Sequence, residues 1–371
     1  MKTNTLAGLF LFTLIANTSY ADRFIEGATT PALSINNNQL IVSYQIERGN
    51  KTSLVVHNLS TDRQQTIAQG DNWFVNWADF PKIATNDHHW VTWYLQHSSD
   101  GQYAYDIMLM QSFDSGNTWT DAIKLHNDNT NAEHGFASIV SHDQRFTIAW
   151  LDGRHTQSTG HQHHSGSGAM TVRSATINSD GTISDRLELD AKTCDCCQTA
   201  IFRHEGESLV AYRDRSDEEI RDTSITRSAP NASPEQWSED DWQINGCPVN
   251  GPTGFSLERP YVVSYTAANS RGDVYITDPS GRRVLLSSNS IGRLDSVVYN
   301  DIAYISFIET QDDDTFVKVV AFDGETATSL PERISLGRSR ASGFPQIEAL
   351  NGQLVIATTT SEGVRLTYID L

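Results

Sequence analysis

The residues best suited to chemistry gather in one stretch near the middle of the chain, from Thr193 to Asp222. Three of the four cysteines lie in this stretch, and the fourth, Cys247, follows 50 residues after Cys197. Its charged side chains include Arg213, Asp214, Arg215, Glu219, Arg221 and Asp222. A hydrophobic core has no use for this mixture, because charged side chains are rarely buried without partners. The stretch therefore predicts a functional site.

The cysteines allow two interpretations. The Cys-x-Cys-Cys cluster of Cys194, Cys196 and Cys197 has a single cysteine, Cys247, as its partner, and so differs from the two Cys-x₂-Cys pairs of a structural four-cysteine zinc site. As thiolates, these residues and Cys247 could hold a soft ion such as Cu(I) or act in thiol redox chemistry. As disulfides, Cys194 with Cys197 and Cys196 with Cys247 are the easier pairings, because adjacent cysteines can scarcely bond each other without strain. Disulfides are favoured and no cofactor is required; a copper or zinc ion is the alternative.

A His-rich segment could extend a metal site. Its imidazole groups belong to His155, His161, His163 and His164, among Gly and Ser residues. Such tracts can bind Cu(II), Zn(II) or Ni(II), and His134 is a further candidate ligand. Taken alone, the segment is typical of a solvated loop, so it supports a metal site only in combination with the cysteines.

Arginines form the second candidate site. The candidate anion ligands are Arg154, Arg213, Arg215, Arg221 and Arg293. Bidentate guanidinium groups match the geometry of a carboxylate ligand. However, Asp152 lies close in sequence to Arg154, and Glu219 lies close to Arg221. Structural ion pairs are therefore an equal alternative to an anion site.

The N-terminus has the pattern of a secretory signal peptide. Lys2 precedes an apolar run from Leu6 to Ala16, and Ser19-Tyr20-Ala21 forms an A-x-A-like cleavage site. The run is shorter than the ~20 residues that span a bilayer, and no later segment is apolar enough to cross one. We expect a signal peptide at 1–21, one mature domain at 22–371, no membrane span, and a periplasmic or secreted location.

The charge balance narrows the choice of partners. The formal net charge of −19 repels nucleic acid and anionic membrane surfaces, so neither is expected to bind. An acidic ligand would need a local cluster of arginines. We expect a small-molecule or glycan ligand, and the sequence leaves the oligomeric state open.

Short β-type runs recur along the chain and must position these residues. Seven units are found, and their first runs begin at residues 32, 82, 137, 200, 254, 295 and 346. No amphipathic helical pattern of useful length interrupts them. Repeated short strands without helices are typical of a β-propeller. We predict an all-β fold with a single seven-bladed propeller, with six blades as the alternative, and we expect Arg23–Glu26 to complete the last blade.

Strand order places the candidate residues at one end of the ring. In an antiparallel blade, the loop that enters the first strand and the loop that joins the second strand to the third lie on the same face. Loops of the first kind hold Trp77, Asp79, His134, the cysteines, Asn250, Arg293 and Asp295. Loops of the second kind hold Asp152, Arg154, the His-rich segment and Arg213–Asp222. The sequence therefore predicts a pocket at this mouth of the channel.

One segment is more specific than the repeats. Ser112-Phe113-Asp114-Ser115-Gly116-Asn117-Thr118-Trp119 matches S-x-D-x-G-x-T-W, the Asp-box turn between the third and fourth strands of a blade. On these residues the chain resembles the sialidase-like (BNR/Asp-box) β-propeller superfamily. It also resembles bacterial exported sialidase-like proteins that carry TCDCCQT, YRDR, EIRD and GCPVNGP segments. The F/Y-R-I-P segment that carries the first arginine of sialidases is not found.

The resemblance implies a sialidase-type site. The arginines would hold an acidic sugar, Asp79 or Asp152 would be the acid/base, and Tyr212 the nucleophile. The predicted ligand-binding residues are Trp77, His134, Arg154, Arg213, Arg215, Glu219, Arg221, Asn250, Arg293 and Asp295. We expect an exported sialidase-like propeller that binds an acidic or sugar ligand, with glycoside hydrolysis as its enzymatic interpretation. The alternatives are a periplasmic metal-binding or thiol-redox protein, and a propeller used only for protein contacts.

Overall fold

The computed structural model describes residues 22–156 and 168–371. The predicted signal peptide and the histidines His161, His163 and His164 lie outside the described residues. Within the described ranges, no helix has the length and apolar character needed to cross a membrane.

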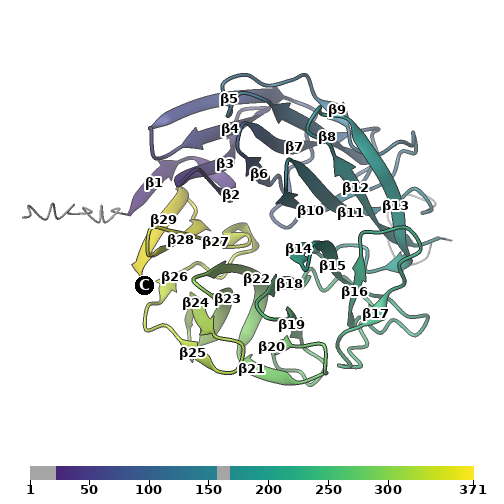
Figure 1. Cartoon of the computed structure of the whole chain (residues 1–371), viewed down its shortest axis with the longest axis vertical. Coiled ribbons are helices and arrows are strands. Elements are labelled where there is room, and N and C mark those ends of the chain that lie inside the picture. The colour runs from purple at the N-terminus through teal and green to yellow at the C-terminus, as the bar shows by residue number, and fades with distance from the viewer. Residues whose placement is uncertain (1–21, 157–167) are drawn as a thin grey trace, which may run out of the picture.

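Seven antiparallel sheets stand around a central axis like the blades of a propeller (Figure 1). Blade 1 contains β2 (Ala28–Asn36), β3 (Gln39–Arg48), β4 (Lys51–Asn58) and β5 (Arg63–Gly70). Blade 2 contains β6 (Ile83–Asn86), β7 (His89–His97), β8 (Tyr105–Ser112) and β9 (Ile123–Lys124). Blade 3 contains β10 (His134–His142), β11 (Arg145–Asp152), β12 (Met170–Ile177) and β13 (Ile183–Thr193). Blade 4 contains β14 (Ala200–His204), β15 (Glu207–Arg213), β16 (Thr223–Arg227) and β17 (Glu235–Gln236).

The remaining blades repeat this order. Blade 5 contains β18 (Thr253–Ser256), β19 (Pro260–Thr266), β20 (Asp273–Thr277) and β21 (Arg283–Ser287). Blade 6 contains β22 (Ser290–Tyr299), β23 (Ile302–Gln311), β24 (Asp314–Phe322), β25 (Ala327–Ser329) and β26 (Ile334–Ser335). Blade 7 contains β27 (Gln346–Leu350), β28 (Gln353–Thr359), β29 (Gly363–Asp370) and β1 (Arg23–Glu26). The one helix of the described ranges is the 3₁₀ turn η1 (Arg340–Ser342). The predicted seven-bladed, all-β architecture is confirmed.

The N-terminal strand closes the ring. β1 pairs antiparallel with β29, with Arg23 opposite Leu366 and Glu26 opposite Gly363, so the two ends of the chain share blade 7. This pairing covers an edge that would otherwise expose unpaired backbone groups. The predicted role of Arg23–Glu26 in the last blade is confirmed.

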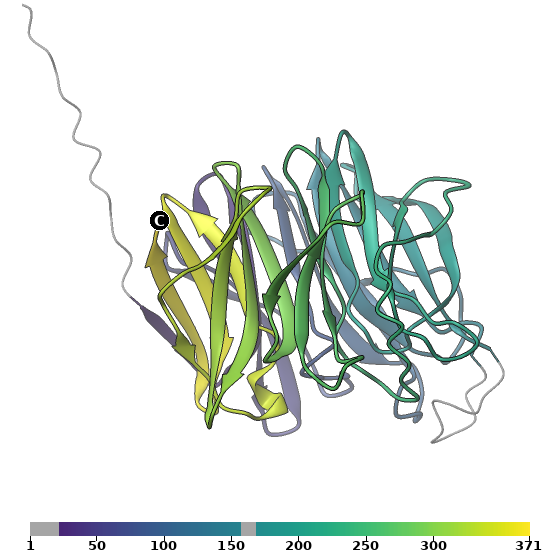
Figure 2. The ribbon, with the colours of Figure 1, turned by 90° about the horizontal axis from the view of Figure 1, so that it is seen from below.

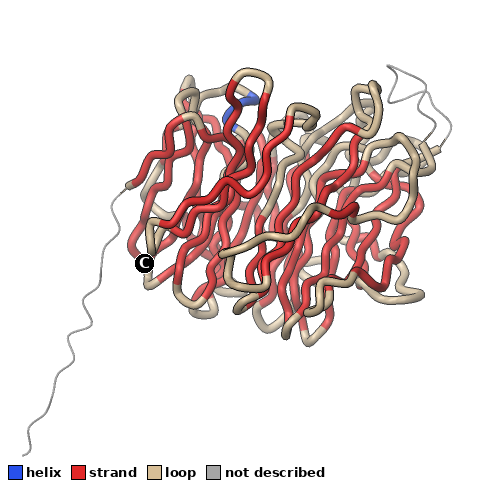
Figure 3. Tube along the Cα trace, turned by 90° about the horizontal axis from the view of Figure 1, so that it is seen from above, coloured by secondary structure: helices blue, strands red, loops and turns tan. Residues whose placement is uncertain are grey.

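The hydrophobic core lies between adjacent blades. Between blades 2 and 3, Trp93 and Trp150 are fully buried and belong to one cluster with Phe146 and Ile148. Burying a large apolar side chain contributes roughly 2–3 kcal/mol, so each blade interface stabilises the ring on both sides of every sheet. Side views show the strands running between two faces that carry the loops (Figures 2 and 3). We call the mouth the face that carries the loops entering each first strand.

Three first strands are irregular where they reach the mouth. The register shifts in β2, β10 and β22, and Thr30, Phe136 and Arg293 adopt positive φ there. Such bulges redirect side chains near the end of a strand. A positive φ is unfavourable for residues with a Cβ, so surrounding contacts must hold these three residues in place.

The turn at Ser112–Trp119 joins β8 to β9, which are the third and fourth strands of blade 2. Asp114 accepts hydrogen bonds from the hydroxyl of Ser112 (2.9 Å) and from the backbone N–H of Thr118 (2.8 Å). Hydrogen bonds from Thr118 lower the pKa of Asp114 to about 2, so the carboxylate stays ionised and closes the turn. Trp119 packs with Ile41 between blades 1 and 2.

Candidate functional site

Strand alternation divides the polar residues of blades 2 and 3 into two clusters. Tyr105 and Asp106 follow each other at the start of β8, while Glu133 and His134 follow each other where the chain enters β10. Tyr105 and Glu133 form an isolated bridge that ties the two positions together. Because successive residues of a strand point to opposite sides, Tyr105 and Glu133 share one side, and Asp106 and His134 share the other.

The first cluster is the carboxyl pair, Asp79 and Glu133, joined through Tyr105. The phenol oxygen of Tyr105 lies 2.6 Å from Oδ2 of Asp79 and 3.0 Å from Oε1 of Glu133. The backbone N–H of Phe136 donates to Oδ1 of Asp79 at 2.7 Å. Asp79 is 2% exposed and Glu133 9%. Gly135 makes room for this arrangement, because a Cβ there would lie 1.8 Å from Oδ2 of Asp79.

If both carboxyl groups are ionised, the cluster has too few protons to make a hydrogen bond at each of the two contacts of the Tyr105 hydroxyl. The phenol carries one proton and can donate to one carboxylate only, so its second short contact requires a proton on a carboxyl group. Burial raises the pKa of Asp79 to about 7, against the hydrogen bonds from Tyr105 and Phe136 that lower it. Burial, and then the nearby Asp79, raise the pKa of Glu133 well above its ordinary value. The pair therefore retains a proton close to neutral pH, as general acid–base chemistry requires.

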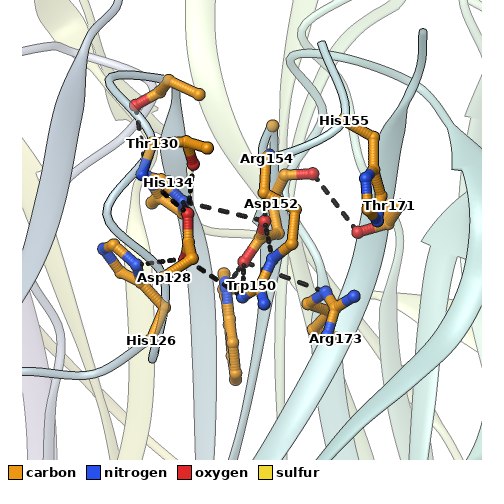
Figure 4. A network of polar contacts seen from close by, with 12 residues as sticks. His126, Asp128, Thr130, His134, Trp150, Asp152, Arg154, His155, Thr171 and Arg173 are labelled. Atoms are coloured by element: carbon orange, nitrogen blue, oxygen red, sulfur yellow. Dashed lines mark hydrogen bonds and ion pairs between the residues drawn. The ribbon is translucent and has the colours of Figure 1, made fainter.

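The second cluster, which we call the histidine cluster, consists of Asp106, His126, Asp128, His134 and Asp152. Figure 4 labels the last four of these residues. His126 lies between two carboxylates, with Nδ1 2.7 Å from Asp128 and Nε2 3.1 Å from Asp106. The rings of His126 and His134 stack in parallel, with centroids 3.6 Å apart. His134 places Nε2 3.4 Å from Asp128 and 3.7 Å from Asp152.

Basic side chains keep the carboxylates of the histidine cluster ionised. Arg154 donates to both oxygens of Asp152, at 2.8 and 2.7 Å, and Lys124 lies 2.7 Å from Asp106. Burial raises the pKa of Asp152, but the hydrogen bonds from Arg154 and Trp150, together with the charges of His134 and Arg154, outweigh burial and lower the pKa. Burial is likewise outweighed at Asp106 by His126 and Lys124, which lower its pKa. Asp106 and Asp152 are therefore ionised, whereas the carboxyl pair retains a proton.

Arg213 connects blade 4 to blade 5 through hydrogen bonds to backbone carbonyl oxygens. Its guanidinium donates to the backbone carbonyl oxygens of Asn250 (2.8 Å), Tyr265 (2.6 Å) and Arg221, and it stacks on Trp242 at 4.8 Å. The residue is 1% exposed. All three nitrogens of the guanidinium are thus used inside the protein.

The other arginines of blade 4 pair with carboxylates. Arg215 donates to Asp195 at 2.8 Å and to Glu219 at 2.7 Å, and Arg221 donates to Glu219 at 2.5 Å. Together with the pairing of Arg154 and Asp152, these contacts match the structural ion-pair interpretation of the arginines. Glu219 is likewise held between two guanidinium groups.

Arg293 differs from the other predicted arginines. It stacks on Trp77 at 4.8 Å, and its Nη1 donates to the carbonyl oxygen of Gly343 at 2.9 Å. No carboxylate of residues 22–156 or 168–371 forms an ion pair with it. Burial, and then the charge of the exposed Arg340, lower the pKa of Arg293 to about 10. Phe344 stacks on the same Trp77 at 5.8 Å, so an aromatic platform and a guanidinium without a carboxylate partner meet at the mouth.

A polar channel continues below this platform. A cavity of about 150 Å³ is lined by Phe80, Phe344, Gln198 and Lys82 among others, and a second one of about 320 Å³ extends from Lys82 to Glu348. Asp295 lines both cavities and accepts from the backbone N–H of Ile347 at 3.0 Å. Burial raises the pKa of Glu348 to about 8.

The side chains of Asn250 and Tyr212 form hydrogen bonds that hold neighbouring parts of the propeller together. Asn250 accepts from the backbone N–H of Arg293 at 2.9 Å, which holds Arg293 in its positive-φ conformation. Tyr212 is fully buried and donates to Asp190 of blade 3 at 2.6 Å. Burial, and then the charge of Asp190, raise the pKa of Tyr212 far above its ordinary value. The structure therefore places Tyr212 between two blades, with its protonated hydroxyl bound to Asp190.

The cysteines are joined in two disulfides. Cys194 pairs with Cys197 and Cys196 with Cys247, with Cα separations of 5.9 and 6.1 Å. The second bond ties the loops that enter blades 4 and 5. In this state none of the four thiols is a metal ligand. His155, the described histidine of the His-rich segment, lies 3.5 Å from Glu188 on an exposed surface.

The residues that complete both clusters were not among the predicted site residues. They are Tyr105, Asp106, His126, Asp128 and Glu133. Three of them stand in loops without a motif, and the other two begin a strand. The one local signal is Gly135, a glycine beside two polar residues where a strand was expected to begin.

Sequence comparisons leave the chain without a family: no protein-family model matches it, and no curated protein matches it. Its fold does match solved structures. An α-L-arabinanase of Penicillium chrysogenum, complexed with arabinobiose, is 12% identical, with a TM-score of 0.51 over 94% of each chain. The polysaccharide lyase Uly1 is 10% identical, with a TM-score of 0.53 over 98% of this chain and 94% of that one.

A Trypanosoma rangeli sialidase is 14% identical, with a TM-score of 0.50, and the match covers 95% of this chain and 60% of the sialidase. Identities this low show a shared propeller fold.

Proposed function

We propose that this protein binds an acidic carbohydrate at the mouth of the ring and cleaves a bond in it, with Asp79 and Glu133 as the acid–base pair. One observation carries the proposal. The hydroxyl of Tyr105 lies within hydrogen-bond distance of two buried carboxyl groups, 2.6 Å from Asp79 and 3.0 Å from Glu133. If both carboxyl groups were ionised, the single phenol proton could form only one of these two hydrogen bonds. The pair therefore keeps a further proton on one carboxyl group, and it can give or take that proton near neutral pH.

The platform beside the carboxyl pair suits a sugar with a carboxylate. Trp77 stands two residues before Asp79 on the same loop and is half-buried, and an indole ring is of the kind that stacks on the apolar side of a sugar. Arg293 lies over that ring at 4.8 Å and, with Arg340, supplies positive charge to a protein whose net charge is −19. A carboxylate on the ligand would complete the hydrogen bonds of Arg293.

Three of the structural neighbours agree with this ligand class, whereas two others are an acylaminoacyl peptidase and the propeller domain of a protease, so the neighbours do not decide it. The names of the first three identify an arabinanase, a polysaccharide lyase and a sialidase, and all three act on carbohydrates. A fold shared at 10–14% identity hosts many chemistries, so the proposal depends on the carboxyl pair and not on the likeness. Export of the protein belongs to the same proposal, since a polysaccharide substrate lies outside the cell membrane.

The carboxyl pair admits two types of bond cleavage. Hydrolysis requires an acid at the leaving oxygen and a second carboxyl group as base or nucleophile, and retaining glycosidases hold these groups about 5 Å apart. Elimination next to a sugar carboxylate requires a base for the proton on the neighbouring carbon and an acid for the leaving oxygen. Both need one protonated and one ionised group. The thiol-redox alternative stays a prediction, because a disulfide is also the oxidised state of a redox-active pair of thiols.

The test is an assay of the purified chain against acidic and matched neutral oligosaccharides. New reducing ends report cleavage of either type, and ultraviolet absorbance of an unsaturated product identifies elimination. We expect cleavage of an acidic substrate that is lost in the Asp79→Asn/Glu133→Gln double variant, while calorimetry still detects binding. Glu207→Gln, at an exposed ion pair on blade 4, is the matched control and should keep full activity. Neither binding nor cleavage of any acidic oligosaccharide would refute the proposal.

A further inference from the structure

We propose that His134, Asp128 and Asp152 bind a divalent transition-metal ion of the Zn²⁺ class, on the side of blades 2 and 3 opposite the carboxyl pair. The donors are one imidazole nitrogen and two carboxylate oxygens, and their ligand atoms lie within 4.8 Å of one another. Mixed nitrogen and oxygen donors suit Zn²⁺ or Mn²⁺. They do not suit Cu(I), which prefers thiolates, or Mg²⁺ and Ca²⁺, which prefer oxygen ligands alone.

The hydrogen bonds of His134 determine which of its nitrogens is available. Nδ1 lies 3.1 Å from the carbonyl oxygen of Tyr105 and 3.2 Å from that of Ala132. Carbonyl oxygens only accept, so Nδ1 carries a proton and donates it. A histidine that binds a metal ion almost always anchors its second nitrogen in this way, commonly on a backbone carbonyl.

The other nitrogen of His134 points at two carboxylates. Nε2 is buried, lies 3.4 Å from Oδ2 of Asp128 and 3.7 Å from Oδ1 of Asp152, and has no hydrogen-bond partner among the described residues. Around a tetrahedral ion with bonds of about 2.1 Å, neighbouring ligand atoms stand about 3.4 Å apart. The two distances from Nε2, 3.4 and 3.7 Å, thus fit the edges of a coordination shell better than they fit hydrogen bonds.

Neighbouring side chains orient the two carboxylates. His126 holds Oδ1 of Asp128 at 2.7 Å, and both Trp150 (2.8 Å) and Arg154 (2.7 Å) donate to Oδ2 of Asp152. The oxygens that face His134 are Oδ2 of Asp128, which also accepts from the hydroxyl and the backbone N–H of Thr130, and Oδ1 of Asp152, to which Arg154 also donates at 2.8 Å. The side chains of Asp128 and Arg154 are 16% and 14% exposed, which leaves the ion a short route from solvent.

The site would stabilise the loop that carries Glu133. Asp128 and His134 stand at opposite ends of the segment that enters blade 3, and Asp152 ends the neighbouring strand β11. An ion that joins all three would fix the backbone next to Glu133 without touching the carbohydrate ligand. The inference therefore stands independently of the proposed function.

The experiment measures binding of Zn²⁺ to the full chain after removal of metals with a chelator. It uses a background with His161, His163 and His164 replaced by alanine, because a His-rich tract binds Zn²⁺ by itself. Thiol titration is run first to show that the disulfides are intact. We expect one Zn²⁺ per chain by calorimetry and elemental analysis, and a thermal unfolding midpoint that rises with added Zn²⁺.

Variants locate the ion. His134→Gln should weaken Zn²⁺ binding at least 100-fold, and the partly exposed Asp128→Asn, which is the safer variant for folding, at least 10-fold. His142→Gln, at a histidine that contacts Thr147 elsewhere in blade 3, is the matched control and should bind like the parent. A folded parent without bound Zn²⁺, or an Asp128→Asn variant with unchanged affinity, would show that the cluster is an ion-pair network only and overturn the proposal.

Discussion

The carboxyl pair and the histidine cluster lie on opposite sides of the same two strands, yet their carboxyl groups differ in charge. Asp79 and Glu133 have raised pKa values, whereas Asp106 and Asp152 have lowered ones. All four are largely or fully buried, so burial alone does not explain the difference. The neighbours do: one side offers a phenol and a backbone N–H, the other Lys124, Arg154 and two imidazoles. The carboxyl pair therefore retains a proton, whereas the ionised carboxylates of the histidine cluster attract cations.

Replacing Glu133 should produce the largest change in activity. Glu133→Gln keeps the shape of the side chain but cannot exchange a proton, so we expect kcat on an acidic oligosaccharide to fall about 10²–10⁴-fold. Steady-state kinetics measures this, and thermal unfolding should show a fold at least as stable as the parent. A variant with undiminished kcat would show that the carboxyl pair does not act as the acid–base pair.

Replacing Asp152 should instead damage the fold. Asp152→Asn leaves Arg154 without its bidentate partner in a buried position, and breaking such a pair costs about 3–5 kcal/mol of the free energy of unfolding. Denaturant unfolding measures the loss. The control is Glu207→Gln at an exposed pair, which should cost less than about 1 kcal/mol. Equal effects at both positions would contradict the structural role of the histidine cluster.

The two sides should also respond to pH in opposite directions. Asp79 holds its proton to about pH 7 when folded and loses it near 3.8 when unfolded, so its contribution to stability is full below pH 3.8 and is lost as pH rises to about 7. A pKa raised from 3.8 to about 7 corresponds to about 4 kcal/mol. The pKa of Asp152 is lowered, so its contribution is full at neutral pH and is lost only as pH falls below 3.8.

Denaturant unfolding between pH 4 and pH 8 tests this contrast. The stability of Asp79→Asn relative to the parent should increase as pH rises from 4 to 7 and then stay constant. Across the same range, the difference between Asp152→Asn and the parent should hardly change. Parallel pH curves for the parent and Asp79→Asn would show that the carboxyl pair has no raised pKa.

The smallest expected effect concerns ligand choice. Arg293→Gln should raise KM for an acidic oligosaccharide about 10-fold, which corresponds to about 1.4 kcal/mol, and leave kcat nearly unchanged. The matched neutral sugar should show no change, because it has no carboxylate for the guanidinium. Equal losses on both sugars would assign Arg293 to the packing of Trp77 and not to recognition of charge.

The architecture could be predicted from the sequence because its signals are local. Short alternating runs and the turns between them indicated the blades, and the spare strand at Arg23–Glu26 indicated how the ring closes. The disulfide pairing is the one that the sequence favoured, since a steric rule about adjacent cysteines excludes one of the three pairings. Each of these features depends on a few neighbouring residues or on one simple restriction of geometry.

The site was harder to predict because its contacts join distant loops. Arg213 has the residue type of a ligand, but backbone carbonyls far along the chain use all its donors. Tyr105 has the pattern of an ordinary strand residue, and only the folded ring brings Asp79 and Glu133 to its hydroxyl. Residue types in the sequence indicated where polar groups gather. Which of these groups still have a donor, an acceptor or a proton to exchange is seen only from the contacts in the folded ring.

Infrared spectroscopy of the carboxyl C=O stretch tests this account most directly, because only a protonated carboxyl group gives that band. At pH 6 the parent should show a band from a buried carboxylic acid, and both Asp79→Asn and Glu133→Gln should change it. Asp152→Asn should leave the band as it is. A parent whose buried carboxyl groups are all ionised at pH 6 would contradict the claim that the Tyr105 side of these strands retains a proton.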